Sequence, residues 1–381
     1  MKTKQGLYHS IPMGVTAFCL ALLMLVTACG GQDEPAVDKE DQPELSDKQI
    51  LIEADGWNPM TESRANIFET SDDLKDEEKG GRNFTLHAYL AESGETFIGG
   101  TRVWYFIPQN ATTGTWEFYD EPNIIHYYWP QQGTVDFFAY MPWKKSSKRK
   151  SIEVGTYTKD GGLTLTCQMQ STTTDGNDST DDLYDPAGQE TIIAYAKGKS
   201  KADGSVNMYF VHPFSAVYFK LKQAHRNLTI NWIRFDNIHL TGSTTLNATT
   251  DGDTSITWSP TDNATNTFTI PVNKIIPDQI NFGGKIGGPY MVMPQSFGKN
   301  TDDKNDDVTI TVSYTWDDGK DDTEDTQKFS RSITTETIKS WIAGNKYTYI
   351  LDLGDNKEEI LFQVLVEPWK GDGYKHEIDV E

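Results

Sequence analysis

The chain has 381 residues and a formal net charge of −22, with 56 acidic against 34 lysine and arginine side chains. This charge argues against nucleic acid as a partner, because binding nucleic acid depends on clustered lysine and arginine. The length is sufficient for two domains of ordinary size.

The N-terminus has the layout of a secretory signal peptide. Lys2 and Lys4 are the only charged side chains before Cys29, and an almost wholly apolar run follows from Phe18 to Thr27. This run is shorter than the roughly 20 apolar residues that a transmembrane helix needs. We predict that residues 1–28 are a signal peptide.

The end of the apolar run, Leu25–Cys29, resembles the lipobox of bacterial lipoproteins. The resemblance implies cleavage before Cys29 and lipid attachment to it, which lowers the formal charge of the mature chain to −24. The acidic residues in 32–34 resemble the surface-export signal of Bacteroidetes lipoproteins, and a solvated tether is the alternative. We expect an acidic tether at 29–47 and a lipid-anchored outer-membrane protein at the cell surface.

Cysteine usage leaves one thiol in the mature chain. Cys19 leaves with the signal peptide and Cys29 takes the lipid, so Cys167 has no partner for an intramolecular disulfide. Cys167 lies in the alternating segment "LTLTCQMQ", without the histidine and positive surroundings that a catalytic thiol needs. We predict a small buried core residue.

From residue 48 onward the dominant pattern has period two. In "KQILIEADG", Ile50 and Ile52 share one side, and "NFTLHAYL" alternates Phe84, Leu86 and Ala88 against Thr85, His87 and Tyr89. Similar runs rich in β-branched and aromatic residues continue to "EILFQVLVEPW", separated by Gly, Asn, Asp and Pro. We predict an all-β fold of two tandem β-sandwiches, 48–212 and 213–381, divided at His212-Pro213, where proline interrupts the pattern.

Helix is expected in only two places. "TSDDLKDEE" (70–78) has the composition of one turn-rich segment, with Ser71 as a possible N-cap. "TTETIKSWIAGNKY" (334–347) has the spacing of a short amphipathic helix that ends near Gly344.

Several loops are strongly charged. The acidic segments 171–182, 298–307 and 317–325 do not keep the ligand register of a calcium-binding EF-hand loop, so solvated loops are favoured over calcium sites. Asp178-Ser179-Thr180 matches an O-glycosylation pattern of exported Bacteroidetes proteins. The basic segment 144–151 is expected to be a solvated loop, with contact to anionic surfaces as the alternative.

The sequence contains no recognisable catalytic motif. Six histidines outside the signal peptide are scattered without metal-ligand spacing, so we predict no enzyme, no cofactor and no metal. Aromatic residues are dense between Trp116 and Trp129. We favour core packing for these two tryptophans, and sugar stacking is the alternative, which would make the chain a glycan-binding surface lipoprotein.

Six motifs in order carry a resemblance to a known family. "TESRANIF", "YYWPQQGTVDFFAYMPW", "FVHPFSAVYFKL", "INWIRFDNIHLTGS", "YMVMPQSF" and the terminal "WIAGNKYTYILDLG…ILFQVLVEPW" resemble the Mfa-like branch of the Bacteroidetes fimbrillins, from about Glu62 to Trp369. The resemblance implies two transthyretin-like β-sandwich domains and a structural or adhesive fimbrial subunit without catalysis.

The resemblance also implies assembly by strand exchange with other fimbrial subunits. A trypsin-like protease removes the first strand, and another subunit's strand fills the groove. The candidate displaced strand is Ile50-Leu51-Ile52-Glu53-Ala54, and the candidate cleavage site is Arg64. Only "KGDGYKHEIDVE" follows the last motif, which favours a tip or accessory subunit over a stalk subunit. Ligands on host or bacterial surfaces are further candidate partners.

Overall fold

The structure is a computed structural model. It describes residues 44–56, 72–76, 82–143, 152–169, 191–224, 228–247, 256–263, 266–276, 284–297, 308–316, 325–332, 338–353, 361–368 and 376–380. Regular structure in these ranges is almost entirely β-strand, with a single 3-10 turn at Asp73–Lys75. The predicted all-β class is confirmed.

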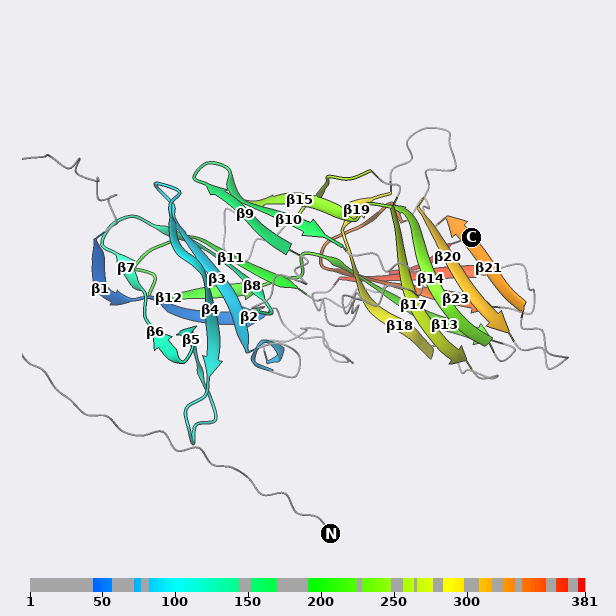
Figure 1. The fold of residues 1–381 in the computed structure, drawn as a ribbon, viewed down its shortest axis with the longest axis horizontal. Helices are drawn as coiled ribbons and strands as arrows, with labels where there is room; N and C mark the ends of the chain where they lie inside the picture. Colours follow the sequence, from blue (N-terminus) through cyan, green and yellow to red (C-terminus); the bar gives the residue numbers. More distant parts are fainter. Residues whose placement is uncertain are drawn as a thin grey trace, which may run out of the picture. The chain divides into compact units, whose positions relative to one another are not determined.

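The largest sheet curls until its two edges meet. Its strand order is β11-β8-β3-β4-β5-β2-β12, and β6 also pairs with β5. At the closing edges, Ile193 and Val211 exchange two backbone hydrogen bonds of 2.9 and 2.8 Å. The strands are β2 (Leu51–Gly56), β3 (Asn83–Leu90), β4 (Thr96–Phe106), β5 (Thr115–Asp120), β6 (Asn123–Ile125), β8 (Val135–Met141), β11 (Ile192–Lys199) and β12 (Ser205–Phe210) (Figure 1).

The inside of this curled sheet is a continuous apolar cluster. Phe84, Val103 and Phe137 are fully buried there, and alternate residues of each strand supply the rest. Because period-two alternation places every second side chain inside, the sheet encloses its own core.

A second sheet covers part of the outer face of the first. Its order is β16-β15-β10-β9, with β9 (Ile152–Thr158), β10 (Gly162–Gln168), β15 (Thr241–Leu246) and β16 (Ser259–Pro260). β15 pairs antiparallel with β10 along its whole length, from Leu163↔Leu246 to Gln168↔Thr241. The sheet therefore combines strands from both sides of residue 212, and the division at 212/213 stays a prediction.

Cys167 lies in the apolar cluster between these two sheets. It is 4% exposed, and burial raises the pKa of its thiol to about 12. The prediction of a core cysteine is confirmed, and the raised pKa makes the thiol unreactive at neutral pH.

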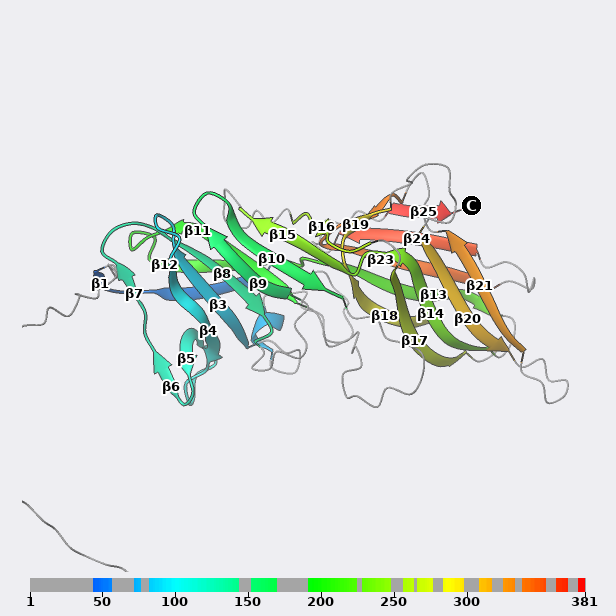
Figure 2. The ribbon, with the colours of Figure 1, turned by 45° about the horizontal axis from the view of Figure 1, so that its top comes forward.

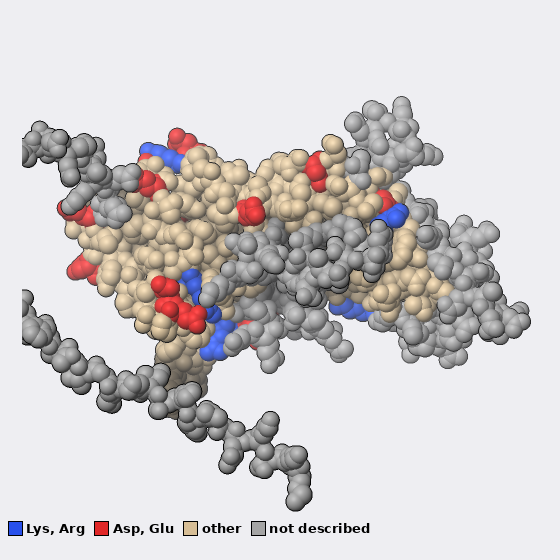
Figure 3. Space-filling model, viewed as in Figure 1, with Lys and Arg blue, Asp and Glu red and all other residues tan. Residues whose placement is uncertain are grey.

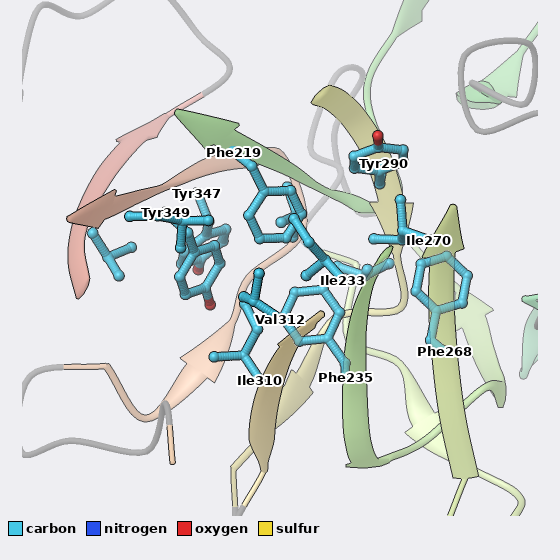
Figure 4. Packing of buried hydrophobic residues seen from close by; sticks show 14 of the residues in the cluster. Phe219, Ile233, Phe235, Phe268, Ile270, Tyr290, Ile310, Val312, Tyr347 and Tyr349 are labelled. Atoms are coloured by element: carbon cyan, nitrogen blue, oxygen red, sulfur yellow. The ribbon is translucent and has the colours of Figure 1, made fainter. Parts of the chain in front are cut away.

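Two further sheets face each other in the second half of the chain. One has the order β18-β13-β23-β24-β25 and the other β17-β14-β20-β21. In Figure 4, Phe219, Phe235 and Tyr349 meet between them, with ring centroids about 6 Å apart (5.9 to 6.0 Å). The strands are β13 (Ser215–Ala224), β14 (Leu228–Ile238), β17 (Asn266–Ile276), β18 (Gly284–Val292), β20 (Thr309–Trp316), β21 (Asp325–Ser332), β23 (Asn345–Leu353), β24 (Leu361–Pro368) and β25 (His376–Val380).

The helix expected at 334–347 is wrong across its described residues. Ser340–Trp341 is strand β22, which pairs with β19 (Gln295–Ser296), and Gly344 turns the chain with φ +72° into β23. Trp341 is 1% exposed, and its indole nitrogen donates a hydrogen bond of 3.0 Å to the Tyr349 hydroxyl. Burial of this ring in the sheet core outweighs the local helical spacing.

The N-terminal tether is shorter than expected. β1 (Leu45–Gln49) pairs with β7 (Tyr128–Pro130), so the last three residues of the predicted tether belong to a strand.

The 3-10 turn begins after Asp72, which makes no capping side-chain bond. The remaining predictions that lie outside the described residues are the signal peptide, Cys29, Arg64, Ser71, the segments 144–151, 171–182 and 298–307, nearly all of 317–325, and Asp178-Ser179-Thr180.

On the face shown in Figure 3, the charged side chains of the described residues do not form one large patch. In the view of Figure 3, acidic side chains occur at several separate places, and several basic ones lie beside them. No helix of the described residues is long and apolar enough to cross a membrane.

Candidate functional site

Strand β2 occupies an unusual place in the curled sheet, because its two edges are paired very differently. It runs parallel to β12 from Leu51↔Ser205 to Gly56↔Phe210. Its contact with β5 is antiparallel and limited to Ile52↔Trp116. One edge of β2 is therefore fully paired, and the other is held at one position (Figure 1).

The side chains of this segment alternate as the sequence predicts. Ile50, Ile52 and Ala54 are 1%, 5% and 4% exposed and belong to the core of the curled sheet. Leu51 is 54% exposed, and Glu53 also faces outward. The segment thus contributes three inward positions, two large and one small.

Aromatic rings surround the inward positions of β2. Trp116 on β5 and Phe210 on β12 flank the strand, and Phe84 on β3 lies 5.0 Å from the first ring and 5.3 Å from the second. The ring of Tyr105 is 5.1 Å from Trp116. These rings and the inward residues of β2 belong to the same buried cluster.

The residues just before β2 are also attached to the sheet. The Ile50 amide donates to the Tyr127 carbonyl at 2.8 Å, and the Gln49 side-chain nitrogen lies 2.7 Å from His126 Nδ1. The Lys48 ammonium donates to the Lys201 carbonyl in the turn between β11 and β12. These bonds fix the entry of the chain into β2.

The structure corrects the sugar-stacking alternative for Trp116 and Trp129. They are 8% and 0% exposed, and the Trp129 ring packs against Phe137 with centroids 5.8 Å apart. Neither ring has a face open to a sugar. Both tryptophans fill the core, which was the favoured interpretation of the dense aromatic segment.

The partly exposed aromatic residues on the outer face of β4 and β5 were not predicted from the sequence. Trp104 and Phe106 alternate with the buried residues Val103 and Tyr105, so they point away from the core. The signal was the strand "TFIGGTRVWYF", in which both alternating sets are aromatic or apolar at its end. That pattern is atypical of a strand with one solvated face.

No assembled metal site occurs in the described part of the chain, where no group of three or more His, Cys, Asp or Glu side chains is suitably placed. The candidate calcium loops lie almost wholly outside those residues.

A family model described as fimbrillin-like matches residues 81–369. This chain belongs to the fimbrillin-like family. The resemblance noted from the sequence is therefore confirmed. Membership places this fimbrillin-like protein in a family of structural fimbrial and adhesion proteins at the cell surface, which implies interaction with other fimbrial subunits. The matched region begins after β2, and no curated protein matches the sequence.

The fold is similar to that of one solved fimbrial protein, and two further solved structures are more distantly similar. A fimbrial protein from Bacteroides vulgatus has a TM-score of 0.53 at 14% identity, covering 84% of this chain and 99% of its own. A putative cell adhesion protein from Bacteroides uniformis has a TM-score of 0.46 at 16% identity, covering 86% and 100%. The tip fimbrial protein Mfa3 from Porphyromonas gingivalis, with a C-terminal truncation, has a TM-score of 0.38 at 10% identity, covering 87% and 99%.

Proposed function

We propose that this protein is a lipid-anchored tip or accessory subunit of a fimbria, and that another subunit's strand replaces its β2. The observation that carries the proposal is the place of β2: it is a core strand near the start of the chain, bonded along one edge and almost unbonded along the other. A strand held in this way can leave without breaking a second complete ladder.

The energetics of the exchange favour a replacement strand with the same pattern. Burial of each isoleucine side chain is worth roughly 1.5–3 kcal/mol, so an emptied groove would expose apolar surface at a substantial cost. An incoming strand recovers that burial with apolar residues at the places of Ile50 and Ile52 and a small one at the place of Ala54. Main-chain bonds to β12 supply the remaining affinity.

The C-terminal strand supports the tip or accessory position. β25 pairs antiparallel with β24 from Phe362↔Val380 to Val366↔His376, at the edge of its own five-stranded sheet (Figure 2). A strand that completes its own sheet is not free to be donated to another subunit unless it first detaches.

The lipid anchor rests on the lipobox at Cys29, and release of β2 rests on cleavage after Arg64. Intact mass spectrometry of the protein from outer membranes tests both proposals. We expect a mass that begins at lipid-modified Cys29, and treatment with a trypsin-like protease should shift the start to Ala65. A mass that stays at Cys29 after protease treatment would contradict activation by strand removal and leave the lipid anchor standing.

Acceptance of a strand is tested separately with a synthetic peptide. After cleavage, a peptide with the sequence of residues 48–56 should bind and restore the thermal stability of the uncleaved protein. A peptide of the same composition, with the positions of Ile52 and Glu53 exchanged, serves as the control because it places a carboxylate in the core. Equal stabilisation by both peptides would contradict an alternating groove.

A further inference from the structure

Arg102 on the outer face of β4 has an unusual environment. Its guanidinium carbon lies 4.4 Å from the ring centroid of Trp143, 5.2 Å from that of Tyr119 and 5.6 Å from that of Trp104. The side chain thus contacts three aromatic rings, one from its own strand, one from β5 and one from the chain after β8.

Arg102 has no acceptor for its hydrogen-bond donors within the described structure. Its Nε is buried and without a hydrogen-bond partner, and no ion pair joins the guanidinium to a described carboxylate. Glu117 lies opposite Trp104 on β5, and its carboxylate accepts a hydrogen bond of 2.8 Å from the Thr115 hydroxyl. A guanidinium has five N–H donors, which usually find acceptors in a protein. At Arg102 these donors have no partner among the described residues, although the chain is rich in carboxylates.

Arg234 provides an internal comparison. It also lies over a tryptophan, with 5.4 Å to the ring centroid of Trp232, and its Nε likewise lacks a well-aligned hydrogen bond. This Nε nevertheless forms an ion pair with the Asp236 carboxylate, at 2.7 Å. At Arg234 the protein supplies the anion. At Arg102 the same stacked geometry is present and the anion is missing from the described residues.

The residues around Arg102 come from β4, from β5 and from the chain segments just before β3 and just after β8. Tyr119 lies directly opposite Arg102 on β5, and Trp104 follows two positions along β4. The Trp143 amide donates to the Asn83 carbonyl on β3 at 3.2 Å, and Arg82 lies over Trp104 at 5.8 Å. The result is a sheet face with a central guanidinium, a second arginine and aromatic rings around them.

We propose that this surface, Arg82, Arg102, Trp104, Tyr119 and Trp143, binds an acidic saccharide. The carboxylate of a uronic acid fits the guanidinium of Arg102 as a bidentate partner, and the apolar face of the sugar ring contacts the aromatic side chains. This site goes beyond strand exchange, because it lies on the outer face of β4 and β5 and uses none of the inward residues of β2.

A saccharide is favoured over an acidic peptide because of the backbone of β4. This strand is already paired with β3 on one side and β5 on the other, so it offers no free edge for main-chain bonding to a peptide. Recognition here depends on side chains alone. A rigid sugar ring with a carboxylate loses little conformational entropy on binding to such a surface.

Affinity electrophoresis of the purified full-length protein in native gels tests the site. Polygalacturonate in the gel should retard the protein, and neutral galactan should not. The net charge of −22 repels an acidic polymer. Retardation by polygalacturonate would therefore indicate a specific binding site and not attraction by the overall charge. We expect Arg102→Gln and Trp104→Ala to weaken the apparent affinity at least about tenfold. The matched control Arg234→Gln should bind as the unaltered protein does.

Several results would overturn the proposal. These are no retardation by polygalacturonate, equal retardation by galactan, or unchanged binding by Arg102→Gln. Displacement of the polysaccharide by polyglutamate at equal carboxylate concentration would assign the surface to an acidic protein segment instead. Arg102→Lys is the second variant if the glutamine variant does not fold. It keeps the positive charge but loses the planar pair of donors that can bind a carboxylate bidentately, so it should also bind more weakly.

Discussion

Asp136 on β8 is 1% exposed, and its carboxylate accepts three hydrogen bonds from neighbouring strands. The donors are the Tyr157 hydroxyl at 2.8 Å, the Tyr195 hydroxyl at 3.1 Å and the Gly198 amide at 2.7 Å. Tyr157 lies on β9, so this buried carboxylate joins the curled sheet to the sheet that covers it. Its role is structural, because three donors leave it little capacity to bind anything else.

Replacement of this carboxylate tests its contribution to stability. We expect Asp136→Asn to lower the free energy of unfolding by about 1.5–3 kcal/mol, because an amide cannot accept from all three donors. The matched control Asp120→Asn, on the exposed end of β5, should change it by less than about 0.5 kcal/mol. Urea unfolding followed by tryptophan fluorescence measures both. Equal effects would show that the buried carboxylate is dispensable.

The two tyrosines bonded to Asp136 predict a loss of stability at alkaline pH. Burial, followed by the neighbouring carboxylate, raises the pKa of Tyr157 and of Tyr195 above the usual value of about 10. The unfolded chain therefore loses these protons first, and the folded state loses stability as pH rises above about 10. Below that pH both states are protonated, and this contribution is fully present.

Urea midpoints between pH 9 and pH 11 measure this dependence. Tyr195→Phe should reduce the slope by up to about 1.4 kcal/mol per pH unit, because it removes one titrating hydroxyl. Tyr128→Phe, at an exposed position, should leave the slope unchanged. An unchanged slope in the Tyr195 variant would mean that its hydroxyl titrates normally in the folded protein.

At the scale of elements, the parallel pair of β2 and β12 predicts that a covalent link will block strand exchange. Glu53 and Asn207 are register partners, and neighbouring strands are close enough for a disulfide. In oxidised Glu53→Cys/Asn207→Cys protein, β2 should stay attached after protease treatment, and the peptide of residues 48–56 should not bind. Reduction should restore both. Mass spectrometry with and without reductant measures the outcome.

The control links two strands that the proposal does not exchange. Thr164 on β10 and Thr245 on β15 are also register partners. The Thr164→Cys/Thr245→Cys disulfide should leave peptide binding intact. If it also blocks binding, rigidity of the whole fold rather than retention of β2 is the cause.

Some elements follow from local pattern and others do not. The alternation in "NFTLHAYL" predicts Phe84, Leu86 and Ala88 inside, and all three are fully buried. Thr85 and Tyr89 are nevertheless only 4% and 6% exposed, because the sheet of β9 and β10 covers that face as well. Burial of the second face of a strand depends on other strands that lie far away in the sequence. A local sequence pattern cannot predict that burial.

The candidate site divides in the same way. The inward positions of β2 are predictable from "ILIEA", because alternation is a local property. The parallel partner β12 lies about 150 residues later, and nothing in either segment encodes that pairing. The surface around Arg102 likewise combines residues from separate segments that strand pairing brings together. No single sequence motif therefore predicts it.

At the scale of the whole molecule, β15 predicts that the two halves are not separable at residue 212. A fragment of residues 44–212 lacks β15, which pairs with β10, and Trp258, which packs in the same apolar cluster as Leu163 and Leu165 of β10. Apolar residues of β10 would then be exposed. We expect this fragment to bind a hydrophobic dye and to self-associate in size-exclusion chromatography, unlike residues 44–381.

A monomeric fragment that unfolds cooperatively and binds no dye would contradict this expectation. It would show that residues 48–212 form an independent sandwich, as the proline at position 213 suggests, with β15 as an addition that the first half does not need.

The parallel ladder between β2 and β12 also bears on how a fimbrial subunit resists mechanical load. When a strand is pulled along its own axis, the load falls on all of its register pairs at once, from Leu51↔Ser205 to Gly56↔Phe210. Under this load the strand separates from its neighbour by shear, in which all hydrogen bonds break together. It does not separate by peeling, in which they break one at a time. In the proposed exchange, a replacement strand that pairs parallel to β12 would have the same geometry, and all of its register pairs would share the load from fluid drag on the cell surface.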